Sequence, residues 1–387
     1  MDKRLKEKIE SIVQNEKMKQ IAKFVLPSPL RREIKKILVK RNVNVIAREE
    51  TPCEDVEYDS ATPISHIKRM QVEITNKCNL KCKMCHRQKL PQHILNQEID
   101  LKLVEKLIPA CQNADYISLS GPSGEPLCSN NLLNILDLVN HYKKDGSLTS
   151  LNTNGILLNE ELIKNLFKRQ LGMIIVSIDG VRSYESLRNI DFTKLLINLL
   201  AFRRIKLEMN SITRMVFNFV AMKRTLPDLL DIIDLAHFLE VTEVNIIPLS
   251  PPSEEWKKEE IIDDTFSNEM LKKAKGYAEA RGLRLIFWWD FEKENKQFGS
   301  NIRVSAAEEK INTPLCDFPF NYIMVTPNGK VWPCCGFYGT LESSLNEATT
   351  LDEIWNGREY TELRKKLSAG IIPSKCTNCT LLRKKFN

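Results

Sequence analysis

Cysteine is the residue type whose placement in this chain points most directly to chemistry. The sequence has 387 residues and 11 cysteines. Eight of these cysteines fall into two groups, the segment CNLKCKMC at 78–85 and a set near the C-terminus, whereas Cys53, Cys111 and Cys128 are isolated. Disulfides are rare in reducing compartments, so clustered cysteines there more often bind metal or take part in catalysis. The two groups are therefore candidate metal sites.

The first group predicts an iron–sulfur site with an open coordination position. Cys78, Cys82 and Cys85 have the spacing C-x3-C-x2-C in a lysine-rich loop that directly follows a predicted strand. Three thiolates in a short loop can bind three irons of a 4Fe–4S cluster and leave the fourth iron without a protein ligand. An open position distinguishes a catalytic metal site from a closed one. A zinc site is the alternative, but zinc motifs usually have paired CxxC units or histidine partners.

The second group predicts a closed metal site. It comprises Cys316, Cys334, Cys376 and Cys379, drawn from a predicted hairpin and a distant CxxC. Four thiolates can bind every iron of a second 4Fe–4S cluster. A four-cysteine zinc site is the alternative here as well. Cys335 is adjacent to Cys334 and cannot easily bind the same cluster.

A regular alternation of strands and helices must position the first group. Short β-rich runs occur at 71–75, 115–120, 148–153, 172–178, 215–222 and 244–250, and 284–289 is a further candidate at the domain edge. Between them lie amphipathic helical patterns such as 131–144 and 226–240. This alternation predicts an α/β fold of parallel βαβ units with right-handed crossovers. Six units are too few to close an eight-stranded barrel, so we expect a partial (βα)6 TIM-like barrel whose active site lies at the C-terminal ends of its strands.

The remaining pattern divides the chain into three parts. We expect a basic helical N-terminal extension, the barrel core and a small C-terminal α+β cluster-binding domain, at 1–62, 63–295 and 310–387. In the last part, 322–335 predicts a hairpin with a type I′ turn at Asn328-Gly329. The segment 350–367 predicts a helix with Thr350 as N-cap and Glu353 completing a capping box.

The bulk composition limits the partners. Hydrophobic residues make up 42% and charged residues 28%, which is typical of a soluble globular protein. No apolar run approaches the ~20 residues that cross a bilayer, and the charged N-terminus has no secretory h-region, so we expect a cytoplasmic protein without a membrane span. Residues 1–48 carry 14 Lys and Arg against 5 Asp and Glu, or +9, which leaves −2 of the total +7 for the rest. The body of the chain therefore has no basic excess of the kind that a nucleic-acid enzyme needs. The N-terminal part is either a solvated helical extension or a surface for nucleic acid, anionic lipid or an acidic partner.

The segment CNLKCKMC resembles the signature of the radical S-adenosylmethionine (SAM) superfamily, and further motifs resemble that family's over about 70–250. Met84 matches the hydrophobic position near the SAM adenine. The segment SGEP at 123–126 resembles the motif that binds the SAM amino group, with Ser123 in place of the usual first glycine. TNG at 153–155 and SIDG at 177–180 resemble strand-end motifs that contact the ribose and the carboxylate. The cofactor-binding residues that the resemblance implies are Met84, Gly124, Glu125, Pro126, Asn154, Ser177, Asp179 and Arg188.

This resemblance implies a reaction. SAM would chelate the open iron of the first cluster, and one electron from the reduced cluster would cleave SAM to methionine and a 5′-deoxyadenosyl radical. That radical would abstract hydrogen from an unactivated C–H bond of the substrate. A one-electron reductant such as flavodoxin or ferredoxin is then an implied partner.

The second cysteine group resembles the SPASM/Twitch extension of radical SAM enzymes. Gly329 lies in the predicted hairpin turn between Cys316 and Cys334, as in that extension. The sequence given ends eight residues after Cys379 without a further cysteine. The resemblance is therefore to the shorter Twitch type, with a single auxiliary 4Fe–4S cluster that accepts an electron from the substrate radical or assists reduction.

The substrate is the least determined part of the prediction. One auxiliary cluster and the lack of a recognisable peptide-binding domain favour a small polyhydroxylated substrate, such as a sugar or aminocyclitol, that undergoes dehydrogenation or epimerisation. Modification of a ribosomally synthesised peptide is the alternative within the family. A non-catalytic iron–sulfur or zinc binding module is a distant third. An epimerase would need a hydrogen donor, for which the thiols of Cys128 and Cys335 are candidates.

Overall fold

The computed structural model describes residues 61–262, 265–289, 314–334, 343–345, 350–377 and 379. The predicted N-terminal helices, Cys53 and Cys335 lie outside these residues. Within the described part of the chain, no helix is long and apolar enough to cross a membrane.

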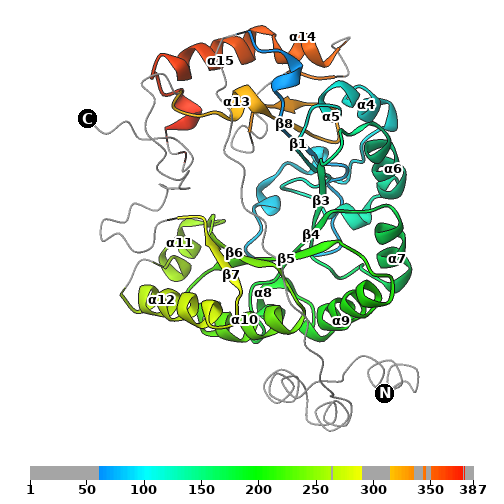
Figure 1. Ribbon diagram of the computed structural model, residues 1–387. Helices are drawn as coiled ribbons and strands as arrows, with labels where there is room; N and C mark the ends of the chain where they lie inside the picture. The colour runs from blue at the N-terminus through cyan, green and yellow to red at the C-terminus, as the bar shows by residue number, and fades with distance from the viewer. Residues whose placement is uncertain are drawn as a thin grey trace.

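A single curved sheet organises the described residues (Figure 1). Its order is β7-β6-β5-β4-β3-β2-β1-β8-β9, and every neighbouring pair is parallel except β8 and β9. The strands are β1 (Arg69–Val72), β2 (Tyr116–Ser118), β3 (Leu148–Thr153), β4 (Met173–Ser177), β5 (Arg214–Ala221), β6 (Glu243–Pro248), β7 (Arg284–Phe287), β8 (Tyr322–Val325) and β9 (Val331–Trp332). The six predicted core strands are thus present as β1–β6 in consecutive order, and the candidate edge strand is β7. The partial barrel is confirmed.

Helices follow the outside of the curved sheet, as Figure 1 shows for α6, α7, α9 and α10. The α-helices are α4 (Leu101–Glu105), α5 (Ile108–Cys111), α6 (Leu132–Tyr142), α7 (Glu160–Lys168), α8 (Tyr184–Arg188), α9 (Phe192–Glu208), α10 (Leu229–Phe238), α11 (Glu254–Glu260), α12 (Thr265–Glu279), α13 (Phe318–Asn321), α14 (Leu351–Trp355) and α15 (Arg358–Ser368). Short 3-10 helices occur at η1 (Ile64–His66), η2 (His86–Lys89), η3 (Gln92–Ile94), η4 (Pro126–Cys128), η5 (Leu226–Asp228) and η7 (Ser374–Cys376).

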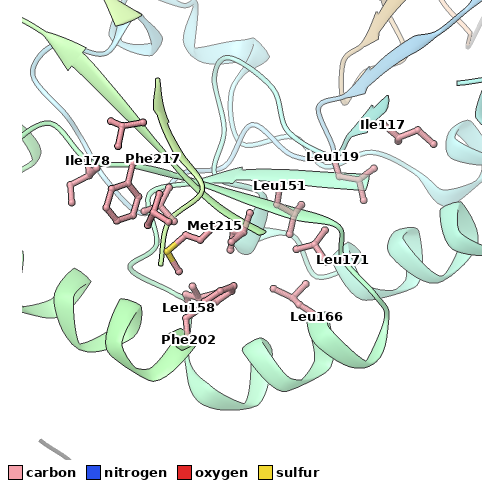
Figure 2. Packing of buried hydrophobic residues seen from close by; sticks show 14 of the residues in the cluster. Ile117, Leu119, Leu151, Leu158, Leu166, Leu171, Ile178, Phe202, Met215 and Phe217 are labelled. Atoms are coloured by element: carbon pink, nitrogen blue, oxygen red, sulfur yellow. The ribbon is translucent and has the colours of Figure 1, made fainter. Parts of the chain in front are cut away.

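The main hydrophobic core lies between the sheet and these outer helices. Figure 2 shows Leu151 of β3 and Phe217 of β5 pointing toward the same layer as Leu166 of α7 and Phe202 of α9. Phe202 is 1% exposed and makes an edge-to-face contact with Phe167 at a ring-centroid distance of 4.9 Å. Because side chains alternate along a strand, the residues between these aliphatic positions face the interior of the barrel.

The C-terminal segment extends the barrel sheet instead of forming a separate sheet. β8 pairs in parallel with β1, and β9 pairs with β8 as a hairpin. The Tyr322 hydroxyl donates to Gln71 Oε1 at 2.5 Å, and Arg69 donates to Asn321 Oδ1 at 2.9 Å. The Arg69 guanidinium also lies over the Phe318 ring at 4.5 Å. Strand β1 therefore forms the joint between the barrel and the C-terminal part.

Two local predictions for the C-terminal part need correction. The hairpin turn is not type I′, because only Gly329 has a positive φ (80°), whereas type I′ requires it at both central residues. Gly329 N–H instead donates to Thr326 O, and Thr326 N–H donates to Lys330 O, which is a type I turn followed by a left-handed glycine. The predicted single helix 350–367 is two helices, α14 and α15, separated at Asn356 and Gly357. The capping box at Thr350 is present.

Candidate functional site

The loop after β1 carries the first cysteine group at the C-terminal end of the barrel. Cys78, Cys82 and Cys85 are all partly exposed. Lys83 N–H donates to Leu187 O at 2.8 Å, which ties the loop to α8, and the Gln88 side-chain amide donates to Cys82 O. These bonds place the three thiols between β1 and the end of the β4 unit.

The thiol of Cys82 lies beside a fixed positive charge. Burial raises the pKa of Cys82 to about 11, and the Arg188 guanidinium, with Nη1 at 3.9 Å from Cys82 Sγ, opposes that rise. Burial also raises the pKa of Cys78. Metal binds the thiolate, so cluster assembly at this loop must release protons. Arg188 is placed to stabilise the thiolate form of Cys82.

Arg188 and Asp179 form a buried ion pair. Their side chains are 8% and 0% exposed, and Arg188 Nε donates to Asp179 Oδ2 at 2.8 Å. The other Asp179 oxygen accepts from Val220 N–H at 3.0 Å. Burial alone would lower the pKa of Arg188, but the charges of Asp179 and the Cys82 thiolate outweigh it and raise that pKa. Arg188 is therefore permanently charged, and Asp179 holds it toward the cluster loop.

The SGEP segment packs against the chain that leads to Cys78. A Cβ atom on Gly124 would lie 1.9 Å from Thr75 O, so only glycine permits this approach. Glu125 N–H donates to Lys77 O at 2.8 Å, and Pro126 begins η4. The segment thus adopts a tight loop despite the serine at its first position.

Glu125 is fully buried and holds the end of β3. Its Oε1 accepts from the Thr153 hydroxyl at 2.6 Å and from Leu127 N–H at 3.1 Å, and its Oε2 accepts from Asn154 N–H at 2.7 Å. Burial raises the pKa of Glu125, while these hydrogen bonds oppose the rise. The side chain therefore fixes the geometry of the TNG segment relative to the SGEP loop.

The other predicted site residues lie around the same loops. Asn154 Nδ2 donates to Asn79 Oδ1 at 2.8 Å, and Cys128 Sγ lies 3.9 Å from the same oxygen. Burial and the Glu125 charge raise the pKa of Cys128. Ser177 is the last residue of β4 and pairs in register with Asn218 of β5. All the predicted site residues of the barrel therefore gather at the C-terminal ends of β1–β4.

A small apolar cluster beside Cys82 was not predicted from the sequence. Met84 is 9% exposed and packs in it with three fully or nearly fully buried residues, Leu187, Met222 and Leu249. Met222 and Leu249 directly follow β5 and β6, which is the one sequence signal that marks them. The cluster gives the predicted adenine contact at Met84 an apolar surrounding.

The second cysteine group also comes together. Cys316, Cys334, Cys376 and Cys379 all belong to one cluster with Leu315, Tyr322, Met324, Trp332, Leu363 and Leu367. Cys379 N–H donates to Cys376 O at 3.0 Å. Burial raises the pKa of Cys316 to about 12, and nearby Asp317, Cys379 and Cys376 add to the rise. The cysteines of the β8–β9 hairpin region and those of the CxxC segment therefore lie together, as their spacing in the sequence predicted.

The donor set of each cysteine group fits an iron–sulfur cluster. The first group offers three thiols from one loop, and the second offers four thiols that belong to one side-chain cluster. Cysteine thiolates are the usual ligands of 4Fe–4S clusters.

Comparison with known proteins agrees with this geometry. The family described as "Radical SAM superfamily" matches residues 72–245, and the "Iron-sulfur cluster-binding domain" SPASM matches 316–380. A "Probable GTP 3',8-cyclase" of Methanocaldococcus jannaschii is 32% identical over 216 residues, which cover 54% of this chain and 67% of the relative. The chain belongs to the radical SAM superfamily. As a radical SAM protein with a SPASM domain, it uses a SAM-binding 4Fe–4S cluster and an auxiliary iron–sulfur cluster.

This radical SAM protein is also similar to two further proteins. The "Tungsten-containing aldehyde ferredoxin oxidoreductase cofactor-modifying protein" of Pyrococcus furiosus is 24% identical over 81% of this chain and 88% of the relative. The solved structure of Streptococcus suis SuiB bound to precursor peptide SuiA has a TM-score of 0.59 at 17% identity, covering 83% of this chain and 70% of SuiB. The likeness to SuiB is one of fold.

Proposed function

We propose that this radical SAM enzyme removes a hydrogen atom from a small polyhydroxylated substrate, such as a sugar or aminocyclitol, in a dehydrogenation or epimerisation. When bound, the reduced cluster and SAM supply a 5′-deoxyadenosyl radical. Cys78, Cys82 and Cys85 would hold that cluster, and Cys316, Cys334, Cys376 and Cys379 the auxiliary one. A flavodoxin or ferredoxin would supply the electron.

The observation that carries the substrate class is the polarity of the barrel interior. On β3, Leu151 packs against the helices, so Ser150 and Asn152 face the opposite side of the sheet. The same alternation places Gln71, Ser118, Ser177, Asn218 and Asn245 on the interior side of the other strands, together with apolar residues such as Ile175, Val216 and Ile247 and, at the strand starts, the charged Arg214 and Glu243. Neutral amides and hydroxyls can donate to and accept from substrate hydroxyls, and they reject analogues that lack them.

One atom of this lining has an unused hydrogen-bonding capacity that a ligand could satisfy. Asn152 Oδ1 is buried and has no hydrogen-bond partner among the described residues. A buried acceptor without a partner costs about 1–3 kcal/mol. Nearby polar groups are paired, since Asn245 Nδ2 donates to Asn218 Oδ1 at 2.8 Å and the Ser150 hydroxyl bonds to the Tyr116 hydroxyl at 2.7 Å. A substrate hydroxyl that donates to Asn152 would remove the cost.

Dehydrogenation and epimerisation place different demands on the chain. In dehydrogenation the substrate radical loses a proton and an electron, and the second cysteine group would hold the electron acceptor. In epimerisation a hydrogen atom returns from the opposite face, and Cys128 and Cys335 are the candidate donors. Cys128 is partly exposed beside the cluster loop, while Cys335 lies outside the described residues.

Modification of a ribosomally synthesised peptide is the second candidate function. The observation that favours it is the shared fold with SuiB, whose solved structure contains a precursor peptide.

Deuterium transfer from the substrate to 5′-deoxyadenosine distinguishes the two candidate functions. A polyol deuterated at carbon should pass its label to 5′-deoxyadenosine, and labelling from a peptide but from no sugar or cyclitol would favour the second function. Turnover in deuterated water then distinguishes epimerisation, which incorporates solvent deuterium, from dehydrogenation.

The catalytic class is tested by removing the first cysteine group. Anaerobic reconstitution of the wild type should give about eight irons per chain, and C78A/C82A/C85A should retain about four and form no 5′-deoxyadenosine. The matched control is C111A, which removes a buried cysteine of α5 outside both groups and should cleave SAM like the wild type. Reductive SAM cleavage by the triple variant would refute the proposal.

A further inference from the structure

A fully buried carboxylate beneath the SGEP loop belongs to none of the predicted site residues. Glu73 directly follows β1 and is 0% exposed. Its Oε1 accepts two hydrogen bonds from Ser123, one from the backbone N–H at 2.9 Å and one from the hydroxyl at 2.6 Å. Ser123 is itself 3% exposed. Hydrogen bonds to a carboxylate in such a dry environment are stronger than neutral ones.

The loop packs closely on the Glu73 side chain. A Cβ atom on Gly121 would lie 2.1 Å from Glu73 Cγ. Two residues later Ser123 bonds to the carboxylate, and Gly124 then meets the backbone oxygen of Thr75. Glu125 N–H reaches Lys77 O at 2.8 Å. Residues 121–125 thus run alongside the segment 73–77 that leads to Cys78 and contact it at successive positions.

We propose that Glu73 is a positioning residue for SAM, and that Ser123 provides the hydroxyl through which it acts. This inference rests on the proposed SAM site. SAM must contact both the cluster held after β1 and the SGEP loop, so its affinity depends on the spacing between these two loops. Binding constellations have to be held within about 0.5 Å of the productive geometry. Glu73 sets that spacing because it is attached to one loop by the chain and to the other by Ser123.

The serine compensates for the departure from the family motif. With glycine at position 123 the hydroxyl bond to Glu73 would be lost, and the bond from the backbone N–H of that residue would remain. With serine, both donors converge on one oxygen. The substitution adds a specific anchor at the position where the resemblance to the family is imperfect.

The test compares two serine-to-carboxylate bonds in the same stretch of chain. S123A removes the bond to Glu73, while S129A removes an equivalent bond of 2.7 Å from the Ser129 hydroxyl to Glu98. SAM affinity is measured on the anaerobically reconstituted full-length protein by equilibrium dialysis, with the change that SAM causes in the electron paramagnetic resonance spectrum of the reduced cluster as a second readout. We expect S123A to raise the Kd for SAM about tenfold, as the loss of one hydrogen bond to a charged group predicts, and to weaken the spectral change. S123G should behave like S123A, and S129A like the wild type.

The outcomes separate the inference from the function on which it rests. If S123A binds SAM within twofold of the wild type, Glu73 does not position SAM through Ser123. An equal loss of affinity in S129A would show a general effect on the loop, and would also overturn the inference. If the wild type itself binds no SAM, the proposed SAM site is wrong, and the role of Glu73 has no basis. E73Q keeps an acceptor oxygen and should bind SAM more tightly than E73A does.

Discussion

Replacing Asp179 by Asn should leave a buried positive charge without its partner. Arg188 donates to Asp179 through Nε at 2.8 Å and through Nη2, and both side chains are almost completely buried. Asparagine keeps the shape and one acceptor, but its amide group opposes the guanidinium and its negative charge is gone. Breaking a buried ion pair from one side costs about 3–5 kcal/mol, because the remaining charge loses its hydrogen-bonded counter-charge.

The chain offers a matched control in Asp228. Its carboxylate also accepts several bonds, from Val181 N–H at 3.0 Å, Ser183 N–H at 2.9 Å and Arg182 Nε at 2.7 Å. The side chain of Arg182 is 56% exposed, however, so it returns to water when Asp228 is changed. D228N should therefore cost about 1–2 kcal/mol, the value of lost hydrogen bonds alone.

Thermal unfolding of the reconstituted protein measures the difference. For a domain of this size 1 kcal/mol corresponds to about 2–4 °C, so D179N should lower the Tm by about 6 °C or more and by clearly more than D228N. D179N/R188M removes both charges and should be more stable than D179N. If D179N and D228N lower the Tm equally, or if the double variant is less stable than D179N, the reasoning about the buried charge is wrong.

Two further predictions concern the loops around the site. G124A should lose SAM binding by equilibrium dialysis because its Cβ would lie 1.9 Å from Thr75 O, and retained binding would mean that the close approach is not needed. The pH dependence of D228N follows from the sign of the pKa shift: burial alone would raise the pKa of Asp228, but bonds from Ser183, Arg182 and Val181 lower it below 3.8. A carboxyl group with a lowered pKa stabilises the fold above its unfolded pKa and loses that contribution in acid. The Tm difference between wild type and D228N should therefore be constant above about pH 5 and shrink as the pH falls below 3.8. A Tm difference that grows in acid would contradict this assignment.

The sequence was sufficient to predict those features of the fold that depend on local patterns. Strand-to-helix alternation identified β1–β6, since each run carries its own periodicity. The cysteine spacing also predicted that Cys316, Cys334, Cys376 and Cys379 come together, as they do in one side-chain cluster, and their role as metal ligands stays a prediction. Hydrogen bonds and packing contacts between residues far apart in the chain could not be predicted from the sequence. Nothing in the sequence near Glu73 indicates that Ser123, 50 positions away, binds its carboxylate, and the apolar cluster at Met84 draws on α8 and on the ends of β5 and β6.

The errors in the C-terminal part have definite physical causes. An Asn-Gly pair favours a type I′ turn, but the bond from Thr326 N–H to Lys330 O lengthens the loop and leaves the positive φ to Gly329 alone. The helical periodicity continues across Asn356 and Gly357, although glycine at that point ends α14 and begins a new helix. The pairing of β8 with β1 has no local signature, because it depends on backbone groups that every residue carries.

That pairing has a consequence for any attempt to study the barrel alone. β1 lies between β2 and β8 in the sheet. A fragment that stops before Tyr322 would leave one side of β1 with unpaired N–H and C=O groups, beside the apolar Met70 and Val72. Exposed strands of this kind recruit other chains and aggregate. The SPASM part is thus a structural cover for the barrel as well as a cluster carrier, and truncation would remove both roles at once.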